Sequence, residues 1–183
     1  MALLGGIVLT LVILMVCASI LGRGVVTFGN WDAFEGFAPS ISDALLGTRI
    51  GPVPGDFELV EAGIAFAIFA FLPLCQLRGG HATVDVFTSF LPDRANDWLK
   101  AFWEVVLTLA ILLITWRLGA GMLDKIETGE ITFILAFPKW WAYAASLFAA
   151  CAASLVAVYC AVARVAEAAT GRPVITGAEE SAP

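Results

Sequence analysis

Four long apolar runs constrain this chain more than any other feature of its sequence. Each is long enough to cross a bilayer, since a transmembrane helix needs roughly 20 mostly apolar residues. Backbone polar groups in hydrocarbon must be satisfied within their own segment, and no alternating barrel pattern is present, so the runs predict helices. We expect an all-α integral membrane protein with four transmembrane helices, at about residues 3–22, 58–77, 99–119 and 140–163.

Composition leaves little room for anything besides these helices. The chain has 183 residues, of which 60% are hydrophobic and 14% are charged, whereas soluble domains are about 45–50% apolar and about 25% charged. We therefore predict one membrane domain over residues 1–170 and a polar tail over 171–183, with no soluble catalytic domain. The net charge of −6 offers no basic patch for phosphates, which argues against a nucleic-acid partner.

The first run argues against a cleaved signal peptide, and the cysteines argue against metal or redox chemistry. Residues 3–22 carry no charge, are longer than the apolar part of a secretory signal and lack a basic start, so they predict an uncleaved helix. The cysteines all fall in apolar stretches without a C-x-x-C pair, and they are interpreted as small buried hydrophobes rather than metal or redox groups. They are Cys17, Cys75, Cys151 and Cys160.

Two connecting segments are too apolar to be free linkers. In the long first connection we expect residues 31–46 to lie along the membrane surface as a short amphipathic segment, and residues 83–91 are similarly amphipathic. His81 is the only histidine, which excludes a haem held by two histidines of this chain and a His-rich metal centre. An interfacial hydrogen bond is the simpler role for His81, with Asp85 as its partner or that of Arg78.

Acidic residues at the helix ends are the candidate polar contacts. Glu58 and Glu61 share one face at the start of the second helix, where acids favour the helix dipole. We interpret them as helix-capping and dipole contacts or as subunit contacts, because a coupling-ion site would need further oxygen ligands. Glu104 lies four residues from Lys100 on the third helix, so it predicts either an ion pair near the surface or a contact with a second subunit.

The fourth helix has a distinct entry and a distinct face. Proline and aromatic rings at Pro138, Trp140 and Tyr143 suit a first helical turn in the headgroup layer. Farther along, small residues that include Ala149 and Ala153 recur at steps of three and four. Helices associate in lipid through close packing at small residues, so this face should contact protein, either this chain or another.

Lys and Arg do not fix the orientation of the chain, because each side of the membrane receives five of them. On one side are Arg78, Arg94, Lys100, Arg164 and Arg172; on the other are Arg23, Arg49, Arg117, Lys125 and Lys139. The positive-inside rule therefore gives no preference.

Two stretches resemble the small (Q, DctQ-like) subunit of TRAP transporters, the tripartite ATP-independent periplasmic family. They are Gly55-Asp56-Phe57-Glu58-Leu59-Val60-Glu61 and Gln76-Leu77-Arg78-Gly79-Gly80-His81-Ala82-Thr83-Val84-Asp85. The P-x-W-x-x-Y-like entry at Pro138, and Arg23 at the end of the first helix, also fit. The resemblance covers nearly the whole chain.

The resemblance implies a partner system in a bacterial inner membrane. A large membrane subunit (M) would move organic acids on a sodium gradient, and a periplasmic binding protein (P) would deliver them. This chain would be a static scaffold without cofactors, embedded among membrane lipids, with both termini in the cytoplasm. Residues that would carry a structural or subunit-contact role are Arg23, Glu58, Glu61, Arg78, His81, Asp85, Glu104, Pro138, Trp140, Tyr143, Ala149 and Ala153.

Two alternatives from other classes stay open. A quinone-linked thiol oxidoreductase also has four helices and four cysteines, but it needs accessible, activated cysteine pairs. A self-sufficient small exporter carries an essential acid in its first span, and the first span here is uncharged.

Overall fold

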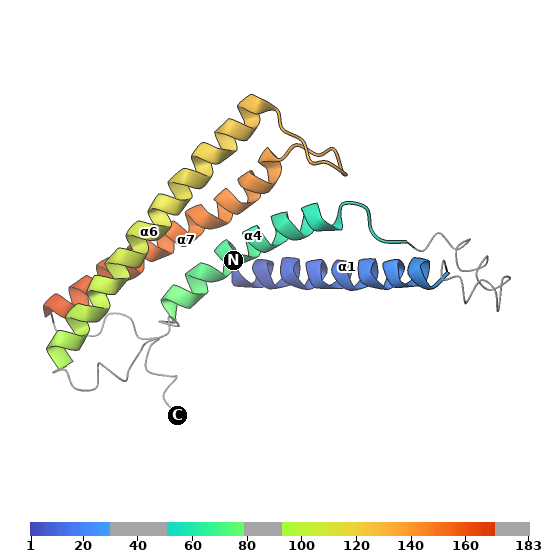
Figure 1. The fold of residues 1–183 in the computed structure, drawn as a ribbon. Helices are drawn as coiled ribbons and strands as arrows, with labels where there is room; N and C mark the ends of the chain where they lie inside the picture. The colour runs from blue at the N-terminus through green and yellow to red at the C-terminus, as the bar shows by residue number, and fades with distance from the viewer. Residues whose placement is uncertain (30–50, 79–92, 171–183) are drawn as a thin grey trace.

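The computed structural model describes residues 1–29, 51–78 and 93–170. It confirms an all-helical chain, with four helices in this part that are long and apolar enough to cross a membrane (Figure 1). The predicted amphipathic segments, His81, Asp85 and the tail 171–183 lie outside the described residues. The four helices are α1 (Ala2–Gly29), α4 (Asp56–Leu77), α6 (Asp93–Thr128) and α7 (Trp140–Thr170).

Three helices extend past the ends expected from hydropathy. The first continues to Gly29 instead of residue 22, the third covers 93–128 instead of 99–119, and the fourth continues to Thr170 instead of residue 163. An apolar run marks only the part that can lie in hydrocarbon, whereas helical hydrogen bonding continues through polar residues in the headgroup layer. At 1.5 Å per residue α6 is roughly 54 Å long, so it must tilt or extend beyond a hydrocarbon core of about 30 Å.

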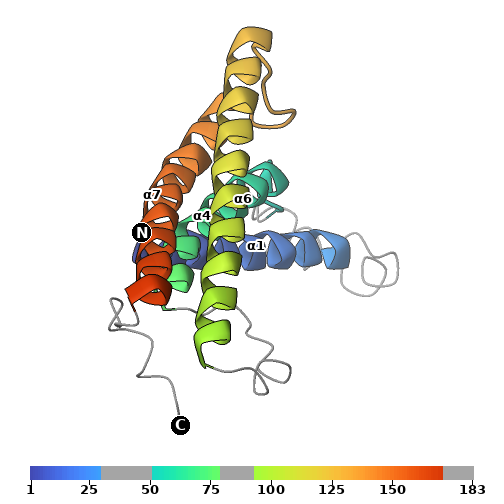
Figure 2. The same cartoon turned by 90° about the vertical axis from the view of Figure 1, so that its left-hand side faces the viewer.

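The helices pack in a row and do not close into a bundle. Among the described helices α1 packs along α4, α4 packs on α7, and α7 packs along α6. In Figure 1 the α1–α4 hairpin and the α6–α7 hairpin diverge like the arms of a V, and the turned view in Figure 2 shows α1 running at a steep angle to α6. Helix α7 is the most buried of the four: 44% of its apolar window is buried, against 11–17% in the other three helices. The outer helices therefore leave broad apolar faces for lipid or for a partner.

Small residues bring α1 and α4 close together. A Cβ added at Gly63 would lie 2.5 Å from Cγ2 of Val12, and one at Gly5 would lie 2.9 Å from Cβ of Ala70. Ser19 is only 1% exposed in α1. Contact of this kind relies on van der Waals packing, which is what holds helices together where hydrophobic expulsion is absent.

The small-residue face of α7 is covered by helices of this same chain. Ala149 and Ala153 are both fully buried. Beside them, the Thr108 hydroxyl on α6 donates to the carbonyl of Ala157 at 3.1 Å, and the hydroxyls of Thr115 and Ser154 lie 2.8 Å apart. The small-residue face of α7 therefore packs against helices of this same chain, which the sequence alone could not decide.

Candidate functional site

Polar interactions concentrate where α4 begins and where the loop 129–139 joins α6 to α7. The carboxylate of Glu130 accepts a hydrogen bond from Nζ of Lys125 at 2.7 Å and from Nζ of Lys139 at 3.1 Å. Lys125 also lies 3.5 Å from Asp124. The two lysines hold the pKa of Glu130 below its usual value of 4.5, first through the Lys125 hydrogen bond and then through that of Lys139.

The loop itself is a small hairpin with a defined backbone. Ile131 and Pro138 form an isolated antiparallel bridge. The N–H of Thr132 donates to the carbonyl of Phe137 at 2.8 Å, and the N–H of Phe137 donates to the Thr132 hydroxyl at 3.0 Å. At the tip, Phe133 is 95% exposed, with the Lys139 ammonium 5.5 Å from its ring centroid. The loop is thus fixed in shape although its apolar side chains face outward.

Glu58 joins this loop to α4. Its carboxylate accepts the backbone N–H of Ile134 at 2.8 Å and that of Leu135 at 3.1 Å. Leu135 also covers Gly55, where a Cβ would lie 2.5 Å from Cγ of the leucine. Gly55 caps α4 with φ 77°, a left-handed conformation that glycine adopts without steric cost. Glu58 therefore caps a distant loop, a role beyond the helix-dipole interaction expected from its position.

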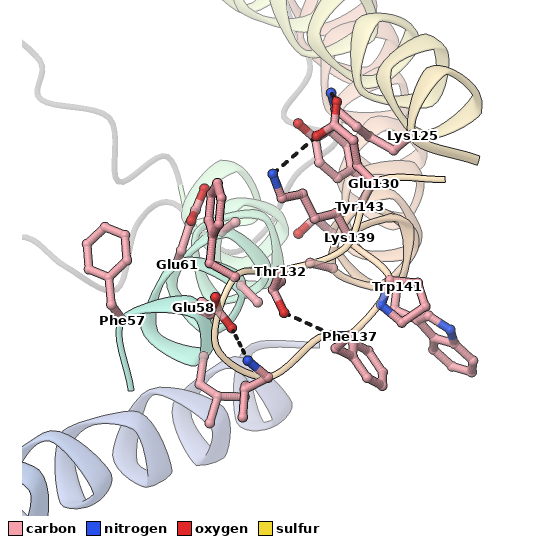
Figure 3. A pocket seen from close by; sticks show the side chains of 18 of the residues that line it. Phe57, Glu58, Glu61, Lys125, Glu130, Thr132, Phe137, Lys139, Trp141 and Tyr143 are labelled. Carbon is pink, nitrogen blue, oxygen red and sulfur yellow. Dashed lines mark hydrogen bonds and ion pairs between the residues drawn. The ribbon is translucent and has the colours of Figure 1, made fainter. Parts of the chain in front are cut away.

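A cavity of about 860 Å³ lies between the two hairpins and under this loop, and we call it the wedge cavity (Figure 3). Its walls come from the first turns of α4 and α7, the end of α6, and the loop. Glu61 and Tyr143 both line it, and neither has a hydrogen-bond or ionic partner within the described residues. Tyr143 packs on α6, where a Cβ at Gly121 would meet its ring carbon Cε1 at 3.2 Å.

A second polar cluster fastens α1 to the start of α4. The Ser19 hydroxyl donates to the carboxylate of Asp56 at 2.5 Å and accepts the backbone N–H of Val53 at 3.3 Å. Arg23, expected at the end of the first helix, lies within the longer α1 and approaches the same Asp56 oxygen at 3.5 Å. Asp56 thus connects the helices, and it also accepts the N–H of Phe57 at 2.8 Å.

The opposite end of the molecule places Glu104 against Gln76. The Gln76 amide donates to the Glu104 carboxylate at 3.3 Å, and Gln76 is only 3% exposed. No ion pair joins Glu104 to Lys100 among the residues that the structure describes. Glu104 therefore contacts α4 of its own chain, which is a partner that helical spacing could not indicate. Arg78 is the C-terminal cap of α4, where its N–H donates to the carbonyl of Leu74 at 3.1 Å.

The predicted site residues fall into separate groups. Glu58, Glu61, Pro138 and Tyr143 line the wedge cavity, whereas Arg23 and Glu104 lie elsewhere. Trp140 stacks on Trp141, with ring centroids 4.9 Å apart, at the entry to α7. The sequence reasoning assigned no contact role to Ser19, Gln76, Lys125, Glu130 or Lys139. Lys125 and Lys139 flank Glu130 in the sequence, and this alternation of charge was the signal that could have indicated their ion pairs with it.

The side chains in these clusters determine whether they could bind a metal ion or react through a thiol. Within the described ranges, no three His, Cys, Asp or Glu side chains come close enough to hold a metal ion. Cys160 is buried in α7, as interpreted from the sequence, but that interpretation is wrong for Cys17 and Cys151, which are exposed on the apolar surfaces of α1 and α7. The polar clusters fasten helices and a loop to one another.

Comparison with protein families gives a match to the family described as tripartite ATP-independent periplasmic transporters, DctQ component, over residues 46–168. This match covers most of α4, α6 and α7 and the candidate site between them. Neither the curated proteins nor the solved structures that were compared include a match.

Proposed function

Because the chain belongs to the DctQ component family of tripartite ATP-independent periplasmic transporters, we propose that it is the small, non-catalytic membrane subunit of such a transporter. In this role it is a static scaffold beside a large transport subunit (M). The large subunit moves organic acids with a sodium gradient, and a periplasmic binding protein (P) delivers them. The chain itself needs no cofactor and carries out no reaction.

The observation that supports this proposal best is the distribution of charged residues along the four helices. Every Asp, Glu, Lys and Arg of the described helices lies outside the middle third of its helix. A transport path needs polar groups or broken helices near the bilayer midplane. The charged clusters instead lie toward the helix ends, while the mid-helix hydroxyls of Thr108, Thr115 and Ser154 bond between α6 and α7 of this chain.

The open row of helices suits a scaffold. Large apolar side chains are exposed along α1 and α6, such as Leu11 at 60%, Leu109 at 61% and Trp116 at 74%. In a membrane these faces can contact lipid or the surface of a larger subunit, where packing rather than polarity governs association. A rigid V that widens the footprint of the transporter needs no motion of its own.

The proposal includes an orientation in a bacterial inner membrane, with both termini in the cytoplasm. The charge count is tied, so this orientation rests on the family resemblance. It places the loop 129–139 and the wedge cavity on the periplasmic side, where a binding protein would arrive, and the Gln76–Glu104 pair on the cytoplasmic side.

Reconstitution tests the division of roles. Liposomes would contain this chain alone, the large subunit alone, or both, with the binding protein and a sodium gradient supplied from outside. We expect uptake of organic acids only when all three components are present. Uptake by this chain alone, or full uptake without it, would contradict the scaffold role.

A further inference from the structure

The wedge cavity divides into a polar end and an apolar end. The polar end is formed by Glu58, Glu61, Lys125 and Tyr143, near the ends of α4, α6 and α7, and by Lys139 at the end of the loop. These side chains lie at the level of the headgroups. Deeper walls come from small or apolar side chains, among them Ala65, Leu118 and Ser146. At 1.5 Å per residue Ala65 is roughly 13 Å along α4 from Asp56. An occupant should therefore be amphipathic, with its polar part under the loop and its apolar part between the hairpins.

Glu61 and Tyr143, at the headgroup end of the cavity, can form hydrogen bonds with a bound molecule. Glu61 has no cation beside it among the described residues, so its carboxylate can accept a charge-assisted hydrogen bond from an ammonium group of an occupant. The Tyr143 hydroxyl likewise has no partner there. Lys139 has three N–H donors, one of which binds Glu130, so it retains donors for a second acceptor. This end of the cavity thus offers the Glu61 carboxylate as an acceptor for an ammonium group. It also offers Lys139 and Tyr143 as donors to an anionic oxygen.

The charge balance selects among headgroups. Five ionisable groups line the cavity, the cations Lys125 and Lys139 and the anions Glu58, Glu61 and Glu130, which gives an excess of one negative charge. A headgroup with net negative charge would be repelled by this excess negative charge. A headgroup that pairs a phosphate with a primary ammonium complements both halves, because the ammonium can donate to Glu61 while the phosphate accepts from Lys139 and Tyr143. A quaternary ammonium has no N–H to donate.

We propose that the wedge cavity binds one phospholipid with a primary-amine, zwitterionic headgroup, its ammonium on Glu61 and its acyl chains between the hairpins. This inference goes beyond the subunit role and does not depend on it. A bound lipid of this kind would fill the gap between the hairpins and hold the V at its observed opening. The cavity volume of about 860 Å³ accommodates a headgroup and the upper parts of the chains, while the rest of the chains continues into the bilayer.

Native mass spectrometry of the full-length purified chain tests the site. The chain would be titrated with phosphatidylethanolamine, phosphatidylglycerol and phosphatidylcholine of identical acyl chains. We expect one phosphatidylethanolamine to remain bound at concentrations where the other two are lost. Because charge-assisted hydrogen bonds are about twice as strong as neutral ones, Glu61→Gln should lower this preference by about five- to tenfold.

Two further variants keep the test decisive. Glu127→Gln removes an exposed acid at the end of α6 that lies outside the cavity, and it should leave the preference unchanged. Ala65→Phe fills the apolar end without altering charge, so it should lower binding of phosphatidylethanolamine while the helical content stays constant. Equal retention of the three lipids by the unmodified chain would overturn the proposal. This is also the result expected if a partner's side chain is the natural occupant of the cavity. An undiminished preference in Glu61→Gln would overturn it too.

Discussion

Glu58 and Ile134 are 76 positions apart in the sequence, yet the backbone N–H of Ile134 donates to the Glu58 carboxylate at 2.8 Å. This bond joins the first turn of α4 to the loop between α6 and α7. The α1–α4 and α6–α7 hairpins are otherwise joined mainly through the packing of α4 on α7. The opening of the V at this end therefore depends on one carboxylate and the loop that it holds.

Replacing Glu58 should release the loop. Glu58→Ala removes the acceptor for both Ile134 and Leu135, and we expect hydrogen exchange at these two amides to rise by about three- to tenfold, since local opening governs exchange. Glu58→Gln keeps a neutral acceptor and should give a smaller rise. The measurement is exchange by mass spectrometry with Glu127→Ala as control. Unchanged protection in Glu58→Ala would mean that the bridge between Ile131 and Pro138 suffices to hold the loop.

Acid should loosen the same loop through Glu130. Its pKa is held below the usual 4.5 by hydrogen bonds from Lys125 and Lys139, so its stabilising contribution is complete above about pH 4.5. That contribution is lost as pH falls below this value through the lowered pKa. We predict that exchange at the amides of Thr132 and Lys139, corrected for intrinsic rates, accelerates in this range. Glu130→Gln should exchange faster at neutral pH and lose the acid-dependent step. An identical acid response in this variant would assign the titration to another carboxylate.

The sequence predicted the four helices because crossing a bilayer imposes a length and a polarity that are visible without a structure. It also indicated that Ala149 and Ala153 face protein. Spacing along one helix could not show the partners that α4 supplies: Gln76 for Glu104, and Glu58 for the loop. Such contacts depend on how α4 packs on α7, which brings together residues that are far apart in the sequence.

Ser19→Ala should weaken the attachment of α1 to α4. Ser19 is 1% exposed, donates to Asp56 and accepts from Val53, so its removal takes one hydrogen bond from each of these two residues. Hydrogen bonds between helices in membranes average about 0.6 kcal/mol and reach about 1.7 kcal/mol, and we expect a loss in this range. Unfolding in mixed micelles measures it. Thr10→Ala is the control, because its hydroxyl bonds only within α1, to the carbonyl of Gly6.

Bulk on the small face of α7 should destabilise this chain itself. Ala153 is fully buried, and added methylene groups in a packed core cost about 1–3 kcal/mol. Ala153→Leu should therefore lower the unfolding midpoint of the purified chain, whereas Ala110→Leu, at an exposed position of α6, should change stability by less than about 0.5 kcal/mol. If Ala153→Leu instead left the chain stable and weakened only its recovery with a large subunit, the α7 face would be part of the subunit interface.

The proposed orientation makes the two ends of α6 distinguishable from outside the cell. Glu127 and Asp97 are both exposed acids on this helix, one near the loop 129–139 and the other near the start of α6. Roughly 45 Å of helix separates them at 1.5 Å per residue, which is more than a hydrocarbon core of about 30 Å, so they lie on opposite sides of the membrane. With Cys17, Cys75, Cys151 and Cys160 replaced, Glu127→Cys should react with an impermeant maleimide on intact cells, and Asp97→Cys only after permeabilisation. The converse labelling pattern would place the wedge cavity in the cytoplasm, where a periplasmic binding protein could not reach the loop above it.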